Sequence, residues 1–291
     1  MKIIKNCFFI FFYSLVFLAC NFNEKKTIDK DKNLSKSNIL ELKINLSMTK
    51  NNEKKYQLIS EIGLEGKHFT QGFIYDEKED SFFVSSGLYG KSRLLKIGAL
   101  TGQTLETFDL PKTYFAEGLS YFGEGLLLQL TWKSHDAFLY QYKPNFKQVQ
   151  TLKNFNENFD QKEGWGVAYN ENNSSIVVSD GSNKLYFLKR KFFSVFKTLS
   201  IEGETVESNK ITFLNELEMI EGKIWANIWR SPYVLIIDPD GEYFSWLDIS
   251  SIARKETGGV LNGVSYDKTQ KRIWITGKNW SKIYEIRLLE K

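Results

Sequence analysis

The stretch Gln71-Gly72-Phe73-Ile74-Tyr75 decides the fold, because related stretches return four more times along the chain. The other copies begin at residues 117, 165, 215 and 262, so the successive spacings are 46, 48, 50 and 47 residues. Each copy has a polar or aromatic first residue and a short run that ends in Tyr or Met. The second residue is Gly except in the fourth copy, which has Glu216. Self-similarity at a nearly fixed period is typical of repeat architectures.

Strand-like runs dominate the chain from residue 70 onward, and no window shows a sustained helical period. Examples are the runs at residues 82–84, 176–178 and 273–275, which are rich in Phe, Val and Ile and are bounded by Gly, Asn, Asp or Ser. Each repeat is large enough for a four-stranded antiparallel sheet. The sequence therefore predicts an all-β fold, a five-bladed β-propeller whose radial closure protects its strand edges.

The first residue of each copy is expected to line one mouth of the central channel. Innermost propeller strands crowd together, and Gly suits such close backbone approach. The residue before that Gly position varies among Gln, Glu, Trp and Asn, whereas structural positions in a repeat usually converge on one residue type. The resulting ring is Gln71, Glu117, Trp165, Asn215 and Asn262.

Polar and aromatic residues also end the second run of each repeat, and we expect them beside this ring. Among the tryptophans, Trp246 and Trp274 are interpreted as inter-blade packing, as in many propellers. For Trp132, Trp165 and Trp229 a pocket wall is favoured, because they cluster with Glu, Asn and Lys at equivalent strand ends.

The N-terminal region has the features of a targeting segment. Lys2 and Lys5 precede an apolar run at residues 8–18, and Leu18-Ala19-Cys20 resembles a bacterial lipobox. The run is short for a membrane span of about 20 residues, so a lipoprotein signal is favoured over a plain signal peptide or a transmembrane anchor. We expect residues 1–19 to be removed, Cys20 to carry lipid such as palmitate, and the protein to be anchored in the cell envelope, facing the periplasm or the exterior.

Composition divides the remaining chain in two. Residues 20–55 are rich in Lys, Asn, Asp and Ser, which predicts a disordered tether. Residues 56–291 carry most of the aromatic and aliphatic side chains, enough for one domain with a substantial core. Because Cys7 lies in the predicted signal, Cys20 is the only cysteine of the mature chain, which excludes an intrachain disulfide and a cysteine-based zinc site. The net charge of +4 gives no support for nucleic-acid binding.

Ten motifs, in order and in register with the repeat, resemble the plant-like glutaminyl-peptide cyclotransferase family. They span about residues 60–288 and begin at Phe69, Gly87, Phe115, Gln129, Gly164, Ser179, Leu214, Ala226, Leu261 and Thr276. The resemblance implies a five-bladed propeller that converts N-terminal glutamine of peptides or proteins into pyroglutamate and releases ammonia. The segment between Glu117 and Trp132 is one residue longer than is usual in the family.

The resemblance also implies roles for individual residues. Glu117 is the expected proton carrier, and it is preferred over Glu124 of the similar motif seven residues later because only Glu117 is in register with the repeat. Asn215 and Lys278 are the expected oxyanion donors, so these three form the predicted catalytic set. The predicted substrate-binding residues are Phe69, Gln71, Phe115, Trp132, Trp165, Trp229 and Asn262.

Metal catalysis is not expected, because the chain has only two histidines, His68 and His135, and no cluster rich in His or Cys. A structural calcium ion in the channel is compatible with the resemblance. The expected partners are peptides or proteins with N-terminal glutamine and, through the lipid anchor, a membrane; the protein is expected to be a monomer.

Two other functions remain open at this point. One is a non-catalytic surface lipoprotein that binds a protein partner through the channel face of its propeller, since fold does not fix function. The other is a hydrolase or lyase that acts on sugars or lactones, which would need paired carboxylates or a metal ion. The predicted ring contains one carboxylate.

Overall fold

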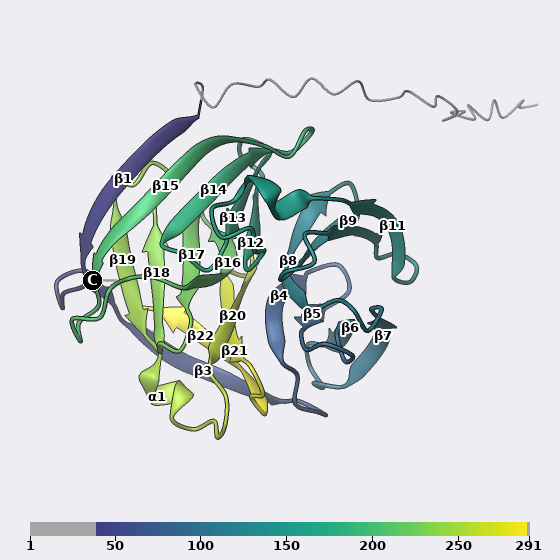
Figure 1. Ribbon diagram of the computed structural model, residues 1–291. Helices are drawn as coiled ribbons and strands as arrows, with labels where there is room; N and C mark the ends of the chain where they lie inside the picture. The colour runs from purple at the N-terminus through teal and green to yellow at the C-terminus, as the bar shows by residue number, and fades with distance from the viewer. Residues whose placement is uncertain (1–38, 290–291) are drawn as a thin grey trace, which may run out of the picture. The chain divides into compact units, whose positions relative to one another are not determined.

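Five sheets, each built on four antiparallel strands, surround a central axis in the computed structural model, which describes residues 39–289 (Figure 1). The predicted all-β, five-bladed propeller is therefore confirmed. The predicted signal, residues 1–19, and the lipidation site Cys20 lie outside the described residues. Within residues 39–289, no helix is long and apolar enough to cross a membrane.

Each repeat unit begins the innermost strand of one blade. Blade 1 contains β4 (Thr70–Asp76), β5 (Ser81–Ser86), β6 (Arg93–Gly98) and β7 (Thr104–Asp109). Blade 2 contains β8 (Ala116–Gly123), β9 (Leu126–Thr131), β10 (Ala137–Gln141) and β11 (Lys147–Leu152). Blade 3 follows the 3-10 helix η2 (Phe155–Asn158) and contains β12 (Val167–Asn170), β13 (Ser175–Ser179), β14 (Lys184–Lys189) and β15 (Ser194–Glu204).

The last two blades follow the same order with one exception. Blade 4 contains β16 (Leu214–Ile220), β17 (Lys223–Ile228), β18 (Tyr233–Ile237) and β19 (Phe244–Asp248), and the short helix α1 (Ser250–Ala253) follows it. The C-terminal part supplies only three strands of blade 5, which are β20 (Leu261–Asp267), β21 (Arg272–Gly277) and β22 (Lys282–Leu288).

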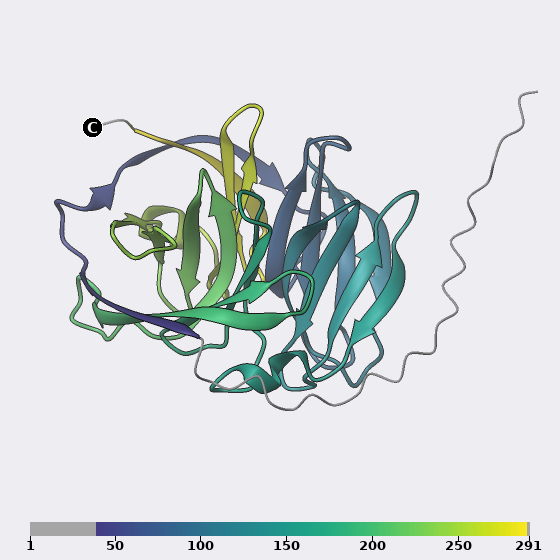
Figure 2. The ribbon, with the colours of Figure 1, turned by 90° about the horizontal axis from the view of Figure 1, so that it is seen from above.

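The fourth strand of blade 5 comes from the other end of the folded chain. Strand β3 (Tyr56–Gly63) pairs antiparallel with β22, from Leu288 opposite Tyr56 to Lys282 opposite Gly63. Figure 2 shows the yellow strands of blade 5 beside the blue strands of blade 1. The first and last blades are thus neighbours, and β3 closes the ring between them.

The repeated glycines lie where neighbouring inner strands almost touch. A Cβ atom on Gly72 would be 2.3 Å from the Leu119 nitrogen, and one on Gly118 would be 2.6 Å from the Trp165 carbonyl oxygen. Such distances leave room only for hydrogen, which explains the recurring Gly. Glu216 differs because its carboxylate accepts the backbone N–H of Val264 at 3.0 Å, so it joins blades 4 and 5 through a hydrogen bond.

The predicted tether, residues 20–55, proved wrong at its C-terminal end. Strand β1 (Leu40–Ser47) pairs in parallel with β15 of blade 3 (Figure 1). Strand β2 (Glu53–Lys54) pairs in parallel with β19 of blade 4. Polar and charged residues dominate this segment, but Leu46 and Met48 are each only 4% exposed. The folded part therefore begins well before residue 56.

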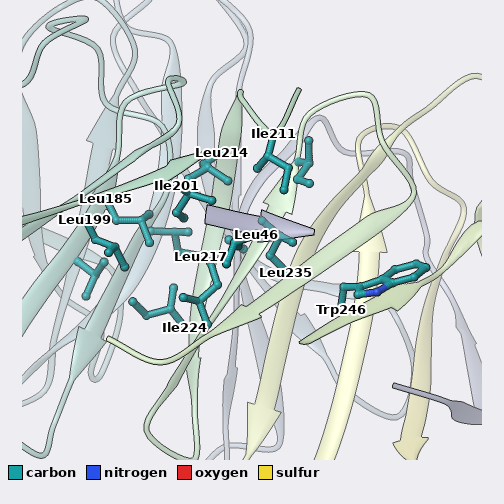
Figure 3. Close-up of a cluster of buried hydrophobic side chains, with 14 of the residues drawn as sticks. Leu46, Leu185, Leu199, Ile201, Ile211, Leu214, Leu217, Ile224, Leu235 and Trp246 are labelled. Atoms are coloured by element: carbon teal, nitrogen blue, oxygen red, sulfur yellow. The ribbon is translucent and has the colours of Figure 1, made fainter. Parts of the chain in front are cut away.

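Apolar side chains fill the spaces between adjacent blades. Figure 3 shows one such cluster, in which Leu185 and Leu199 of blade 3 meet Leu217 and Leu235 of blade 4. Trp246 belongs to the same cluster, and its indole donates to the Thr49 carbonyl at 2.9 Å. Trp274 packs against Tyr75 and Phe82 between blades 5 and 1, with ring centroids 4.3 and 5.2 Å away. Their predicted role in inter-blade packing is confirmed.

Candidate functional site at the channel mouth

The predicted ring residues lie in irregular backbone at the beginning of the inner strands. In four blades the pairing between the first and second strands shifts register at these residues, between Thr70 and Gly72, Ala116 and Leu119, Leu214 and Leu217, and Leu261 and Val264. In blade 3, Trp165 lies two residues before the first residue of β12, with Gly166 between them. Bulges re-aim side chains that a regular ladder would direct to the two sheet faces. Because the strands begin irregularly, the side chains of the ring residues need not alternate between the two sheet faces at this end of the channel.

Glu117 is the buried carboxyl group of this ring, with 4% of its surface exposed. Its Oε1 accepts a hydrogen bond from Gln71 Nε2 at 2.9 Å. Gln71 in turn accepts from Asn262 Nδ2 at 3.2 Å, and the same Asn262 nitrogen donates to the Thr70 carbonyl at 2.9 Å. Amides from blades 5 and 1 therefore hold the carboxyl of blade 2 in place.

Burial raises the pKa of Glu117 well above its usual range, because the charged form loses its hydration. The nearby Lys278 ammonium opposes this shift, whereas the Glu163 carboxylate adds to it. Burial also lowers the pKa of Lys278, and the charge of Glu117 opposes that change. The site thus contains a carboxyl and an amine whose charged forms are both disfavoured by desolvation and favoured by each other.

Lys278 follows the last residue of β21 and is 6% exposed. Its backbone forms an isolated β-bridge with Phe69, and its Nζ lies 5.2 Å from the centre of the Phe69 ring. Blade 5 is thereby linked to the segment that enters blade 1. An ammonium over an aromatic face is favoured electrostatically, so Phe69 helps to place this cation.

Asn215 is fully buried, and neither atom of its side-chain amide has a hydrogen-bond partner among residues 39–289. Its backbone carbonyl accepts the Ser179 hydroxyl at 2.7 Å, which fixes the position of the residue. A buried amide without a partner costs free energy. It is therefore an available donor and acceptor inside the channel mouth.

The predicted aromatic residues form two groups of ring contacts around these polar residues. Phe115 contacts Phe69 and Trp132 with centroids 6.1 and 5.5 Å apart, and Trp165 contacts Trp229 at 5.9 Å. All five are half-buried, which leaves part of each ring free to face a ligand.

Three site features were not predicted from the sequence. Tyr89 and Phe213 extend the aromatic groups, because they contact Phe115 at 5.4 Å and Trp229 at 5.7 Å. Glu163 is a second carboxylate near the ring: its Oε2 accepts both the Trp132 indole N–H, at 2.6 Å, and the Trp165 indole N–H, at 2.8 Å. The sequence signal for Glu163 was only its position two residues before a pocket tryptophan.

Two sequence features fall at the other end of the inner strands. Glu124 is exposed in the turn after β8 and pairs with Arg190 at 3.5 Å, so it is not part of the ring. The segment between Glu117 and Trp132 contains a second register shift in the pairing of β8 with β9, between Tyr121 and Gly123.

A separate cavity of about 310 Å³ also lies at that opposite end. It is lined by residues that include Tyr121, Glu218 and Tyr266, and it contains none of the predicted site residues. The channel mouth with Glu117 is the end that carries the predicted site residues, namely the hydrogen-bonded chain of Glu117, Gln71 and Asn262, the Lys278 ammonium and the five half-buried aromatic rings.

The mouth has the parts needed for proton transfer and for stabilising a developing negative charge. A carboxyl with a raised pKa can accept and return a proton near neutral pH. The Lys278 ammonium and the Asn215 amide are hydrogen-bond donors that suit an oxyanion. The aromatic walls limit access of water and suit an aliphatic or amide-bearing side chain.

Comparisons with known proteins agree on one family. Residues 33–288 match the glutamine cyclotransferase family. The chain is 33% identical over 239 residues to a glutaminyl-peptide cyclotransferase of Arabidopsis thaliana, which covers 80% of this chain and 71% of the plant protein. The crystal structure of Myxococcus xanthus glutaminyl cyclase is similar with a TM-score of 0.69 and 30% identity, and covers 81% of this chain and 97% of that one.

Proposed function

The chain belongs to the glutamine cyclotransferase family, and from this premise we propose that its channel mouth, centred on Glu117, converts N-terminal glutamine of peptides or proteins into pyroglutamate with release of ammonia. The observation that carries the proposal is the buried Glu117 carboxyl, held by Gln71 and placed among aromatic rings and donors. The reaction belongs to the acyltransferases, since an acyl group passes from one nitrogen to another.

The substrate carries both reacting groups, so proximity is already provided by its own structure. Its free α-amine attacks the γ-carbonyl carbon of the same glutamine and closes a five-membered ring. The C–N bond to the departing ammonia then breaks. The enzyme has to select the folded conformer and to move protons.

Glu117 is the proton carrier in this proposal. As a carboxylate it accepts the proton that the amine loses during attack, and as a carboxylic acid it returns that proton to the leaving ammonia. A strongly acidic carboxyl would accept the proton poorly, so the raised pKa of Glu117 suits both halves of the cycle.

Asn215 and Lys278 stabilise the oxyanion that forms on the γ-carbonyl oxygen. The Asn215 amide is buried without a partner in the described chain, so the tetrahedral intermediate gains a donor that no other protein group occupies. Lys278 adds a positive charge in a desolvated environment, where electrostatic interactions are stronger than in water.

Phe69, Phe115, Trp132, Trp165 and Trp229 bind the methylene groups of the glutamine side chain and exclude water. Gln71 and Asn262 hold Glu117 through their hydrogen-bonded chain, so their role in this proposal is orientation of the carboxyl as well as contact with substrate.

We propose that this chemistry needs no metal cofactor, because the proton carrier and the oxyanion donors are side chains of the protein. For a calcium ion in the channel, Glu216 offers one unpartnered carboxylate oxygen. Calcium takes about six to eight oxygen ligands, and residues 39–289 contain no group of three acidic, His or Cys side chains placed for a metal. We therefore derive no role for calcium.

Anchoring and assembly form a separate part of the proposal. The lipobox-like sequence at Cys20 supports a lipid anchor that holds the propeller at an envelope membrane, facing the periplasm or the exterior. We propose a monomer, because the five blades close the propeller within one chain and the site needs no second copy. Replacement of Cys20 by Ala should release the protein from the membrane fraction; retention of the variant there would argue against the lipid anchor.

The function is tested by pyroglutamate and ammonia formation from a dipeptide that begins with glutamine. Wild-type protein should exceed the spontaneous rate in the presence of a chelator, and Glu117→Gln should fall to near that rate. A folded wild-type protein without turnover would favour the alternative, a propeller that only binds a protein partner. A binding protein should also be indifferent to Glu117→Gln, so the variant separates the two functions.

A further inference from the structure

Glu163 lies between η2 and β12, in the connection that joins blade 2 to blade 3. Its side chain is 20% exposed. A single oxygen, Oε2, accepts the indole N–H groups of Trp132 and Trp165 at 2.6 and 2.8 Å. Hydrogen bonds to an ionised acceptor are shorter and stronger than neutral ones.

The two tryptophans come from different blades. Trp132 follows β9 in blade 2, whereas Trp165 precedes β12 in blade 3 and contacts Trp229 of blade 4. The same connection is fixed to the wall by Gly164, whose N–H donates to the Trp132 carbonyl at 3.1 Å. Glu163 thereby joins two aromatic groups that have separate positions in the fold.

The charge of Glu163 is only partly balanced. Its Oε1 lies 3.3 Å from Lys133 Nζ, but the Lys133 side chain is 54% exposed, so water screens this ion pair. Lys133 Nζ also lies over the Trp132 ring at 4.1 Å. The strand of Glu117 is tied to one of these tryptophans, because the Gly118 N–H donates to the Trp165 carbonyl at 2.7 Å. The Glu163 charge raises the pKa of Glu117, whereas the Lys278 ammonium opposes that shift.

We propose that Glu163 is a positioning residue of this site, which holds the Trp132 and Trp165 indoles with one carboxylate and places a fixed negative charge near Glu117. The inference rests on the proposed function and extends it. The aromatic wall is then preorganised by a charge, not by packing alone, and the same charge favours the protonated state that Glu117 needs when ammonia leaves.

Two variants separate these two effects. Glu163→Gln keeps an oxygen that can accept the indole N–H groups but removes the charge. Because Glu163 raises the pKa of Glu117, its neutralisation should lower that pKa, and the acidic limb of kcat/KM should move to lower pH with KM within about twofold of wild type. Glu163→Ala removes charge and acceptor, so it should show the same limb shift and a KM increase of about tenfold, as expected for about 1.4 kcal/mol.

Lys133→Gln is the matched control. It removes an exposed cation that lies beside Glu163 and over the Trp132 ring but leaves both indole bonds and the carboxylate, so KM should stay within about twofold of wild type and the acidic limb should not move to lower pH. The substrate amine titrates identically with every protein, which assigns any difference between the limbs to the enzyme. Thermal unfolding of each variant checks that it is folded.

The two variants test the positioning role and the electrostatic role of Glu163 separately. A wild-type KM in Glu163→Ala overturns the positioning role, and a wild-type pH profile in Glu163→Gln overturns the electrostatic role. If wild type shows no turnover, the proposed function fails, and the positioning role is then judged from binding of the same dipeptide followed by tryptophan fluorescence. Equal dissociation constants for wild type and Glu163→Ala would overturn it there as well.

Discussion

At the scale of single residues, the charges around Glu117 oppose each other in a way that pH can reveal. Lys278 favours the carboxylate, whereas burial and Glu163 favour the acid. Activity should rise with pH through the pKa of Glu117, because only the carboxylate can accept the proton of the attacking amine. This rise is the acidic limb of the pH–rate profile. A neighbouring positive charge should shift it to lower pH, and a neighbouring negative charge should shift it to higher pH.

Lys278→Met should move the acidic limb of kcat/KM to higher pH, opposite to the direction expected for Glu163→Gln. Loss of the ammonium removes the group that lowers the pKa of Glu117, so that pKa rises further. The plateau should also fall, because an oxyanion donor is lost. The check is a pH–rate profile beside Lys112→Met, an exposed lysine whose loss should change neither feature. A limb that stays in place would mean that Lys278 does not influence Glu117.

Asn215→Ala should separate catalysis from stability. The side-chain amide has no partner among the described residues, so its removal breaks no internal hydrogen bond and relieves a desolvated polar group. We expect kcat to fall by about 10²–10³-fold, the cost of one oxyanion donor, while the melting temperature stays equal or rises. A large drop in melting temperature with little change in kcat would assign Asn215 a structural role.

The residues of the ring could be read from the sequence because each occupies the same place in a repeat, which in four of the five copies is followed by a glycine that the crowded inner strands require. Glu163 could not, because it lies between two repeats and gains its contacts only when the loop brings it to Trp132, 31 residues earlier. Tyr89 and Phe213 were missed for the same reason, since both lie in connections between strands.

At the scale of elements, the blades were predictable and the strands added to them were not. Leu40, Leu42, Ile44 and Leu46 alternate with polar residues, which is a strand signal. The abundance of Lys and Asn around them favoured a tether instead. Their pairing with β15 extends blade 3, and such a long-range contact leaves no local signature beyond the alternation.

Gly203 is the residue of β15 that makes this added strand possible. It has a φ of +138°, and a Cβ atom there would lie 1.9 Å from the Leu46 carbonyl oxygen. Gly203→Ala should therefore displace β1 and lower the free energy of unfolding by roughly 1–3 kcal/mol. Urea unfolding measures the loss, and limited proteolysis should show earlier cleavage within β1.

Gly125→Ala is the control for this substitution. Its φ of +75° also disfavours a side chain, but no atom lies within 4 Å of the added Cβ. Gly125→Ala should lower the free energy of unfolding only by the cost of the strained backbone, and β1 should resist the protease as it does in wild type. Equal protease sensitivity of β1 in both variants would show that the contact between Gly203 and Leu46 does not hold the strand.

At the scale of the whole molecule, the site is assembled across the place where the ring closes. The Asn262–Gln71 hydrogen bond and the Phe69–Lys278 bridge both join blade 5 to blade 1. Strand β3 leads directly into this segment and holds blade 5 through seven paired residues of β22. Closure of the propeller and completion of the site are therefore the same structural event.

This coupling predicts different results for three N-terminal truncations. A chain that begins at residue 37 keeps every described strand and should match the full chain in stability and kcat. One that begins at residue 56 loses β1 and β2 but keeps β3, so it should remain active with a lower urea midpoint. One that begins at residue 64 loses β3 and exposes the β22 edge together with the apolar residues that β3 covers, including Tyr284 and Ile286.

The third chain should lose folded structure and activity together, because Phe69 and Gln71 are then no longer held against Lys278 and Asn262. Near-ultraviolet circular dichroism and pyroglutamate formation, followed across the same urea series, provide the measurement. In the chain from residue 56, both signals should change at one midpoint, since a propeller that opens at blade 5 also opens its site. If the chain from residue 64 stays active, the ring residues keep their geometry without closure by β3. The stability of the site would then come from the individual blades and not from closure of the ring.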